Sequence, residues 1–345
     1  MKKIAIKIFI LRIVLGSALL LIGIFAGYYL DRYKNDGQLI SELRQSTYDQ
    51  NGAAKNYKFI DPLLACNAPS KKEIVEFNAL KTRIDSLIAD KTSQNKASQV
   101  SVYFDTRDGR WLSINPTEKY SPASLMKVPT AIAVFKEAES QPDILTKKIT
   151  YDGSFDYDQN EYFKPAELLT ANQAYTAEEL LRRMLVDSDN NAYFLLSKNT
   201  KADILNEIYS DLGITLPANE IEGTKDFLTV KQYANFFRIL YNASYLNWPL
   251  SEKALNLLSN ANFSEGLLAG VPQGLVVAHK FGERSFAGTD SASQKELHDC
   301  GIVYYPNHPY LLCVMTKGNN FSDLAGVIGS ISGTVYQFID TEYKK

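Results

Sequence analysis

The sequence predicts an α+β fold in three layers (α/β three-layer): an antiparallel sheet flanked by terminal helices, with an inserted all-helical subdomain. Runs with strand alternation occur early in the chain, at 100–114, and late, at 274–316, whereas the segment between them has helical spacing and caps. Strands from both ends must then pair in one sheet, with the helical middle beside it. A chain of 345 residues that is 45% hydrophobic and 22% charged can bury such a core.

The first elements of the domain are a helix and a hairpin. Ser70 to Glu73 has the pattern of a capping box, and apolar side chains at helical spacing then predict a helix over 71–92. Alternation at 100–104, a turn at Asp108-Gly109 and renewed alternation at 111–114 predict two antiparallel strands. These two strands precede the segment that carries the most informative motif.

The middle of the chain, about 128–262, is predicted to be helical. Capping boxes at Thr176–Glu179 and Thr229–Gln232 begin apolar-periodic segments. Apolar, β-branched or aromatic runs separated by turns then predict three late strands, at 274–281, 299–305 and 310–316. An amphipathic helix over 321–342 closes the domain, which we place at 70–345.

The amino-terminal segment has the pattern of a membrane anchor. A basic stretch at 1–12 precedes eighteen uncharged residues at 13–30, and a polar stretch at 31–69 follows as a stalk. The basic excess predicts a cytoplasmic amino terminus, with the domain outside the cytoplasm, in the periplasm or at the cell surface. The alternative is secretion after signal cleavage, although no clean small-x-small site follows the apolar run.

The charge of the remaining chain argues against nucleic acid as a partner. Removing the six basic and two acidic groups of residues 1–37 from 37 Lys+Arg and 39 Asp+Glu leaves 31 and 37, a net charge of −6. The membrane is therefore expected to be contacted only through the amino-terminal helix, and we expect a monomer.

The three cysteines do not predict a disulfide framework. Cys300 and Cys313 lie on strands that flank the turn at 306–309, so they could lie near each other. We interpret them as buried free thiols.

Ser124 and Lys127 have the spacing of a nucleophile and its base. A helix brings residues i and i+3 to the same face, so the Lys127 amine can take the proton of the Ser124 hydroxyl during attack. Ser121 and Pro122 precede the pair as helix-start signals, and an apolar run follows it. A buried helix would hold the pair rigidly.

Two further triplets accompany this motif. Ser188-Asp189-Asn190 falls between two predicted helices, where a turn can direct polar side chains into a cleft. Lys280-Phe281-Gly282 ends the first late strand, where the lysine would lie at the edge of the sheet and the glycine allows close backbone approach. Each triplet alone is a weak signal.

In this order, Ser-x-x-Lys, Ser-Asp-Asn and Lys-Phe-Gly resemble the motif set of serine β-lactamases and penicillin-binding peptidases, closest to the class A β-lactamase-like branch. The resemblance covers most of 70–345. It implies that Ser124 is the acylated nucleophile, Lys127 its base and Ser188 a proton relay. Asn190 would contact a substrate amide, and Lys280 would be an electropositive anchor. The resemblance also places Gly282 and Glu283 at the substrate, with the N–H groups of Ser124 and Glu283 forming an oxyanion hole.

The chain departs from the family pattern in two places. Phe281 stands where the family has Thr or Ser, so recognition of a substrate carboxylate by that hydroxyl is lost. The segment between 213 and 229 is short and lacks the family's Glu and Asn that orient the deacylating water; its acids are Glu220, Glu222 and Asp226. Either Glu222 or Glu220 would have to act as the deacylation base, and a solvated loop acid is the alternative.

Aromatic and histidine residues add less to the functional prediction. Tyr157 and Tyr162 fall where the family has a cleft-lining aromatic, with core packing as the alternative. The three histidines have no metal-ligand spacing, so we expect neither a metal nor another cofactor.

The functional prediction is a serine hydrolase that forms a covalent acyl-enzyme and hydrolyses β-lactams. One alternative is a D-Ala-D-Ala carboxypeptidase or penicillin-binding protein with slow deacylation, acting on a peptidoglycan stem peptide. Another is a non-catalytic extracytoplasmic sensor of β-lactams or cell wall.

Overall fold

The computed structural model describes residues 57–62, 77–106, 109–217, 225–286 and 294–344. Apart from Tyr57 and Lys58, all the described residues belong to one compact unit, Phe59–Lys345. The unit thus includes Phe59 and Ile60, whose N–H groups donate to the Glu252 carboxylate, ahead of the predicted domain start at 70. The predicted anchor at 13–30 lies outside the described residues. Among the helices that the structure describes, none has the length and apolar character needed to cross a bilayer.

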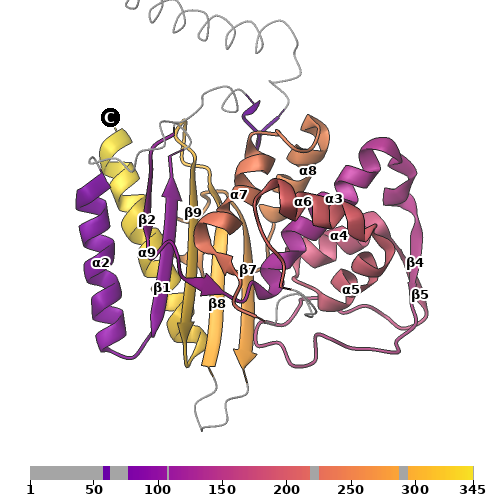
Figure 1. Cartoon of the computed structure of the whole chain (residues 1–345), viewed down its shortest axis with the longest axis horizontal. Coiled ribbons are helices and arrows are strands. Elements are labelled where there is room, and N and C mark those ends of the chain that lie inside the picture. Colours follow the sequence, from indigo (N-terminus) through magenta and orange to yellow (C-terminus); the bar gives the residue numbers. More distant parts are fainter. Residues whose placement is uncertain (1–56, 63–76, 107–108, 218–224, 287–293, 345) are drawn as a thin grey trace, which may run out of the picture. The chain divides into compact units, whose positions relative to one another are not determined.

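A five-stranded antiparallel sheet forms the centre of the domain, in the order β2-β1-β9-β8-β7 (Figure 1). Its strands in chain order are β1 (Gln99–Asp105), β2 (Trp111–Ile114), β7 (Val277–Phe286), β8 (Gln294–Val303) and β9 (Tyr310–Gly318). The early strand β1 pairs with the late strand β9, with Val102 opposite Val314. The prediction that strands from both ends share one sheet is confirmed.

The strand β7 is longer than the sequence indicated. The prediction that Lys280-Phe-Gly ends this strand is wrong, because its pairing with β8 continues past Glu283, opposite Leu297, to Phe286, opposite Gln294. The motif therefore lies inside a rigid ladder. The prediction that it lies at the edge of the sheet is confirmed, since β7 is the last strand in the order.

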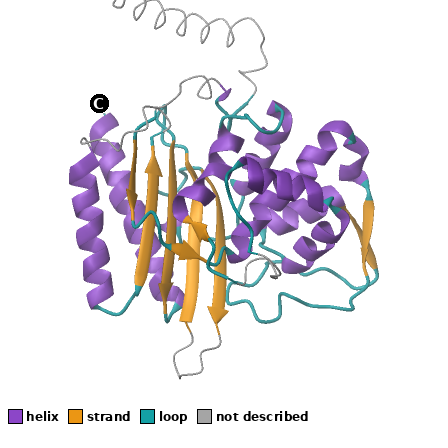
Figure 2. Ribbon diagram, viewed as in Figure 1, coloured by secondary structure: helices purple, strands orange, loops and turns teal. Residues whose placement is uncertain are grey.

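Helices cover both faces of the sheet and complete three layers (Figure 2). The helices α2 (Asn78–Ser93) and α9 (Phe321–Tyr343) pack on each other, and α9 packs on β8 and β9. The main core lies here, with Leu80, Ile84 and Ile331 fully buried. On the opposite face, α7 (Val230–Tyr241) packs against β1, β8 and β9 and joins the sheet to the inserted region.

The inserted region is largely helical, as predicted. Its helices are α3 (Lys127–Ser140), α4 (Ala177–Val186), α5 (Asn190–Asn199), α6 (Ala202–Asp211) and α8 (Trp248–Leu258), with the short 3-10 helices η4 (Ala123–Met126), η5 (Pro142–Thr146) and η6 (Leu267–Gly270) nearby. The capping box predicted at Thr229 is confirmed, since Thr229 and Gln232 form both of its bonds. At the other predicted box Thr176 accepts from the Glu179 N–H, but the Glu179 carboxylate contacts Arg182 and Arg183 instead of closing the box. The sequence did not predict the two-stranded pairs β4 (Lys148–Tyr151) with β5 (Gln173–Thr176), and β3 (Lys119–Tyr120) with β6 (Leu228–Thr229).

Cys300 and Cys313 form a disulfide bond. The interpretation of these residues as free thiols is wrong, because the register of β8 and β9 places them directly opposite each other. Both side chains are fully buried. The link therefore joins two central strands of the sheet.

Candidate active site

Ser124 lies on η4, immediately before α3 begins at Lys127. As predicted, the side chains of Ser124 and Lys127 lie next to each other, with Lys127 Nζ 2.8 Å from Ser124 Oγ. Ala123, the residue before the serine, has φ +48°, a left-handed conformation that costs energy in a residue with a Cβ atom. The surrounding fold therefore enforces the backbone that presents Ser124.

Lys127 is a fully buried lysine held by four polar contacts. Besides Ser124 Oγ, its Nζ lies 2.6 Å from the Ser188 carbonyl oxygen, 3.1 Å from Ser188 Oγ and 2.6 Å from Asn190 Oδ1. Burial lowers the pKa of Lys127 to about 8, although nearby carboxylates, Glu161 first among them, oppose the shift. At pH 7 roughly a tenth of this amine is therefore unprotonated and able to accept a proton.

Ser188 lies between two lysines. Its Oγ is 3.1 Å from Lys127 Nζ and 2.8 Å from Lys280 Nζ. Burial first, and the charge of Lys127 second, lower the pKa of Lys280 well below its ordinary value. Ser188 has φ +58° in the turn between α4 and α5, so this residue too is held in a strained conformation. A hydroxyl between two amines is placed to pass a proton from one group to another.

Two buried aspartates hold the turn that carries Asn190. Asp189 Oδ1 caps α5 by accepting from the Ala192 N–H at 2.7 Å. Asp158 accepts from the Asn190 N–H at 2.8 Å and from Asn191 Nδ2 at 2.7 Å. Burial raises the pKa of Asp189 to about 7, and Asp158 adds to the rise. The orientation of Asn190 thus depends on a residue, Asp158, that comes from a distant loop.

Gly282 permits β7 to pack directly against the helix of the nucleophile. A Cβ atom at Gly282 would lie 2.9 Å from the Leu125 nitrogen and 2.9 Å from the Pro122 oxygen, closer than any real Cβ approaches backbone. The expectation of a close backbone approach at this glycine is confirmed.

Phe281 is a core residue and not a cleft residue. It is 4% exposed and stacks on Phe263 at a ring-centroid distance of 4.2 Å. The Lys280 amine lies over the Phe281 ring at 4.2 Å and donates to the Phe281 carbonyl oxygen at 2.9 Å. The aromatic ring therefore helps to hold Lys280 and offers no hydroxyl to a substrate.

The cleft loop, residues 152–172 between β4 and β5, brings carboxylates to the site that the sequence did not predict. Glu161 Oε1 accepts from Asn190 Nδ2 at 2.8 Å. On β7, the Glu283 carboxylate accepts from the Tyr162 N–H at 3.2 Å and from the Phe163 N–H at 2.8 Å. The Phe163 ring packs against Phe263, Phe281 and Phe321. The loop thus spans from the Ser188-Asp-Asn turn to the edge strand.

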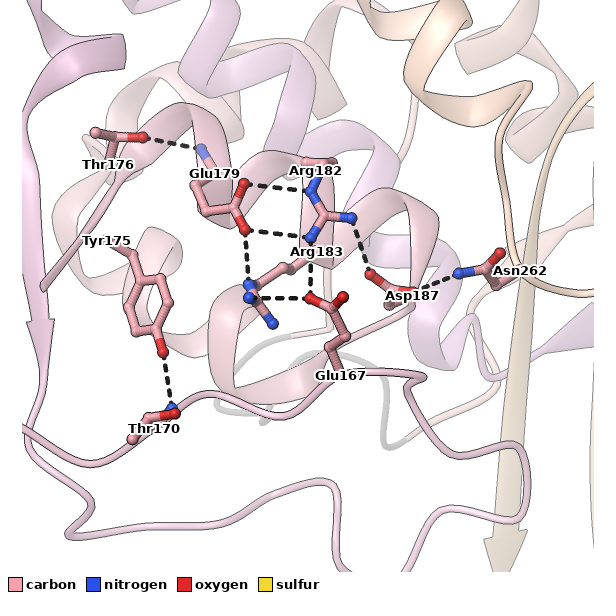
Figure 3. A network of polar contacts seen from close by, with 9 residues as sticks. All are labelled: Glu167, Thr170, Tyr175, Thr176, Glu179, Arg182, Arg183, Asp187 and Asn262. Carbon is pink, nitrogen blue, oxygen red and sulfur yellow. Dashed lines mark hydrogen bonds and ion pairs between the residues drawn. The ribbon is translucent and has the colours of Figure 1, made fainter. Parts of the chain in front are cut away.

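Ion pairs fasten the returning part of the cleft loop to α4 (Figure 3). Glu167 lies 3.2 Å from Arg183 and 3.6 Å from Arg182. Both arginines also contact Glu179, and Arg182 reaches Asp187 at 3.3 Å. The Tyr175 hydroxyl accepts from the Thr170 N–H. A loop without regular secondary structure is therefore fixed to α4 through Glu167 and to β7 through the N–H groups of Tyr162 and Phe163.

A cavity of about 160 Å³ lies beside Ser124. Its lining residues are Ala123, Ser124, Met126, Lys127, Glu161, Asn190, Tyr193, Glu283 and Arg284. The nucleophile, its neighbouring amine and two glutamates therefore share one small space.

The structure brings together Ser124, Lys127, Ser188, Asn190 and Lys280, and places Gly282 and Glu283 beside them.

Glu220 and Glu222 lie outside the described residues. Asp226 forms an ion pair with Lys317. Tyr157 and Tyr162 are 50% and 58% exposed, so neither is a core residue. The sequence signal for the missed loop was its acidic cluster ahead of Thr176, at Asp152, Asp156, Asp158 and Glu161.

We expect the buried Glu283 carboxyl to make the free energy of unfolding depend on pH. Burial first, and the Glu161 carboxylate with it, raise the pKa of Glu283 from 4.5 to about 8. A raised acid pKa means that the folded state binds the proton more tightly, so this contribution is fully present below pH ~4.5 and is lost as the pH rises through about 8. Thermal unfolding at successive pH values measures how the free energy of unfolding changes with pH. We expect Glu283→Gln to lose the decrease between about pH 4.5 and 8, and Glu178→Gln, at an exposed site, to keep it. Equal slopes for wild type and Glu283→Gln would contradict the assignment.

The fold and this arrangement of side chains define the class of serine β-lactamases and penicillin-binding proteins. The family model described as "Beta-lactamase enzyme family" matches residues 79–339. The chain belongs to this family.

Solved structures share the fold at low sequence identity. PBP-A has a TM-score of 0.62 at 22% identity, covering 79% of this chain and 99% of its own. The TLA-3 extended-spectrum β-lactamase has a TM-score of 0.66 at 22% identity, with coverage of 76% and 98%. A class A β-lactamase representative from Bacteroides cellulosilyticus has 0.64 at 22%, with coverage of 76% and 97%. Among curated proteins, no sequence matches significantly.

Proposed function

We propose that this protein hydrolyses β-lactams through a covalent acyl-enzyme on Ser124. The observation that carries the proposal is the 2.8 Å separation of Lys127 Nζ and Ser124 Oγ, together with a Lys127 pKa of about 8. An amine with this pKa, in contact with a hydroxyl, is a general base matched to neutral pH.

Acylation follows from the contacts of these residues. Lys127 takes the Ser124 proton while Oγ bonds to the lactam carbonyl carbon, and the N–H groups of Ser124 and Glu283 are proposed to stabilise the oxyanion. The carbon–nitrogen bond then breaks. Ser188, 3.1 Å from Lys127, passes the proton to the leaving nitrogen, while Lys280 Nζ holds the Ser188 oxygen in place by donating a hydrogen bond to it at 2.8 Å.

The β-lactam as substrate is supported by the relatives. A PBP-A variant with this fold, at a TM-score of 0.62 and 22% identity, has been solved as an acyl-enzyme complex with penicillin G. We place the enzyme on the outer side of the cytoplasmic membrane, since the basic and apolar pattern of residues 1–30 is typical of an anchor with a cytoplasmic amino terminus.

A fluorescent penicillin tests the proposal. The purified full-length protein is incubated with the probe, and intact mass follows both formation of the covalent adduct and its decay, with Ser124→Ala as the control. We expect an adduct on wild type only, which decays within seconds. An adduct lasting hours would indicate a carboxypeptidase, a penicillin-binding protein or a sensor. No adduct on wild type would disprove the acyl-enzyme.

A further inference from the structure

Release of an acyl group from a serine requires an activated water. The ester is hydrolysed efficiently only if a positioned base removes a proton from the attacking water, which is worth roughly 10²–10⁴-fold in rate. Among the described residues that line the cavity beside Ser124, two carry carboxylates, Glu161 and Glu283. Within the described part of the chain, these two are therefore the candidates for the base.

Glu283 is already committed to structure. Its two oxygens accept from the N–H groups of Tyr162 and Phe163, and its carboxyl group shares a hydrogen bond with Glu161. Its pKa of about 8 means that Glu283 is mostly protonated at neutral pH. Among the residues that the structure describes, Glu161 is the carboxylate of this pair that accepts from no backbone N–H and faces Asn190 instead.

Glu161 is aligned by the same amide that aligns Lys127. Asn190 Nδ2 donates to Glu161 Oε1 at 2.8 Å, and Asn190 Oδ1 accepts from Lys127 Nζ at 2.6 Å. Glu161 is also the first of the carboxylates that act on the Lys127 charge. One side chain thus sets the positions of the amine beside Ser124 and of a carboxylate across the same cavity.

The cavity has room for the water. Its volume of about 160 Å³ is well above the roughly 10–15 Å³ that a cavity needs to hold one water. Ser124, Lys127 and Glu161 all border this volume, so the space that would hold the water adjoins both the serine and the carboxylate.

We propose that Glu161, on the cleft loop, is the catalytic residue that deprotonates the deacylating water. The water oxygen bonds to the acyl carbon while one water proton passes to Glu161. The bond from that carbon to Ser124 Oγ then breaks, and the proton held by Glu161 passes through cavity water to the neutral Lys127 amine and from there to Oγ. The acid product leaves, and Glu161, Lys127 and Ser124 are back in their starting protonation states. This inference rests on the proposed acyl-enzyme of Ser124.

The test separates acylation from deacylation in Glu161→Gln. Gln keeps the length of Glu161 and an oxygen that can accept from Asn190 Nδ2, but it cannot take a proton. With the full-length protein and fluorescent penicillin, we expect the acylation rate to stay within a few-fold of wild type and adduct decay to slow roughly 10²–10⁴-fold. Hydroxylamine, a nucleophile that needs no base, should release the adduct. Glu161→Asp, which keeps a carboxylate, should recover part of the decay rate.

The control is Asp152→Asn on the same loop, whose exposed carboxylate accepts from Ser154 and does not line the cavity, and its adduct should decay as that of wild type does. If Glu161 only fastens the loop or shapes the substrate site, the adducts of Glu161→Gln and wild type will have equal lifetimes. That result overturns the proposal but leaves the acyl-enzyme intact. Absence of an adduct on wild type overturns the acyl-enzyme and the role of Glu161 together.

Discussion

Replacing Lys127 by methionine is expected to slow acylation of Ser124 by roughly 10²–10⁴-fold, the usual contribution of a general base. Methionine fills a similar volume but removes the amine that lies 2.8 Å from Ser124 Oγ. In wild type, the fraction of Lys127 that is unprotonated rises about tenfold per pH unit until it levels off above its pKa of about 8. The acylation rate should follow this curve, and the variant should lose it.

Stopped-flow measurement of adduct formation between pH 5 and 9 checks both expectations. Lys136→Met is the matched control, since Lys136 lies on the same helix and its amine pairs with Glu139 at the surface. It should retain the wild-type rate and the wild-type pH profile. An unchanged profile in Lys127→Met would show that another group activates Ser124.

Replacing Asp299 by alanine is expected to reduce the free energy of unfolding by about 2–6 kcal/mol, because two buried donors lose their acceptor at roughly 1–3 kcal/mol each. Asp299 is fully buried on β8, with its oxygens 2.9 and 3.0 Å from His279 Nδ1. Its Oδ2 also accepts from the Leu267 N–H at 2.8 Å. The change leaves both donors unsatisfied under the strand that carries Lys280.

Urea unfolding of the purified protein measures this loss. Asp85→Ala provides the comparison, because Asp85 forms an exposed ion pair with Lys81 and should cost about 0.5 kcal/mol or less. Asp299→Asn keeps an oxygen for Leu267 and should fall between the two. A loss below about 1 kcal/mol in Asp299→Ala would mean that water or another side chain satisfies His279 and Leu267.

Regular elements with strong local signals were predictable. The caps at Thr176 and Thr229 and the helix at 321–342 agree with the structure because each depends on side chains three or four residues apart. The ends of β7 were not predictable, since Glu283 and Arg284 interrupt the apolar pattern while the ladder with β8 continues to Phe286. The partner strand, and not the local sequence, extends this element.

The cleft loop was the main omission, for a physical reason. Residues 152–172 have no helical or strand periodicity, so the sequence shows only an acidic cluster. Asp158 and Glu161 become site residues because the loop is held to β7 through Glu283 and to α4 through Glu167. Contacts between residues so far apart in the chain leave no local pattern.

The sequence by itself determined the order and types of the reactive groups. The i, i+3 spacing of Ser124 and Lys127 is a property of one helical turn, and the Ser188-Asp-Asn and Lys280-Phe-Gly motifs identify the resemblance without coordinates. Only the tertiary structure decided which of these groups carry protons. The pKa values of Lys127 and Glu283 are shifted to about 8 by burial among residues distant in sequence, and the same packing places Glu161 across the cavity from Ser124.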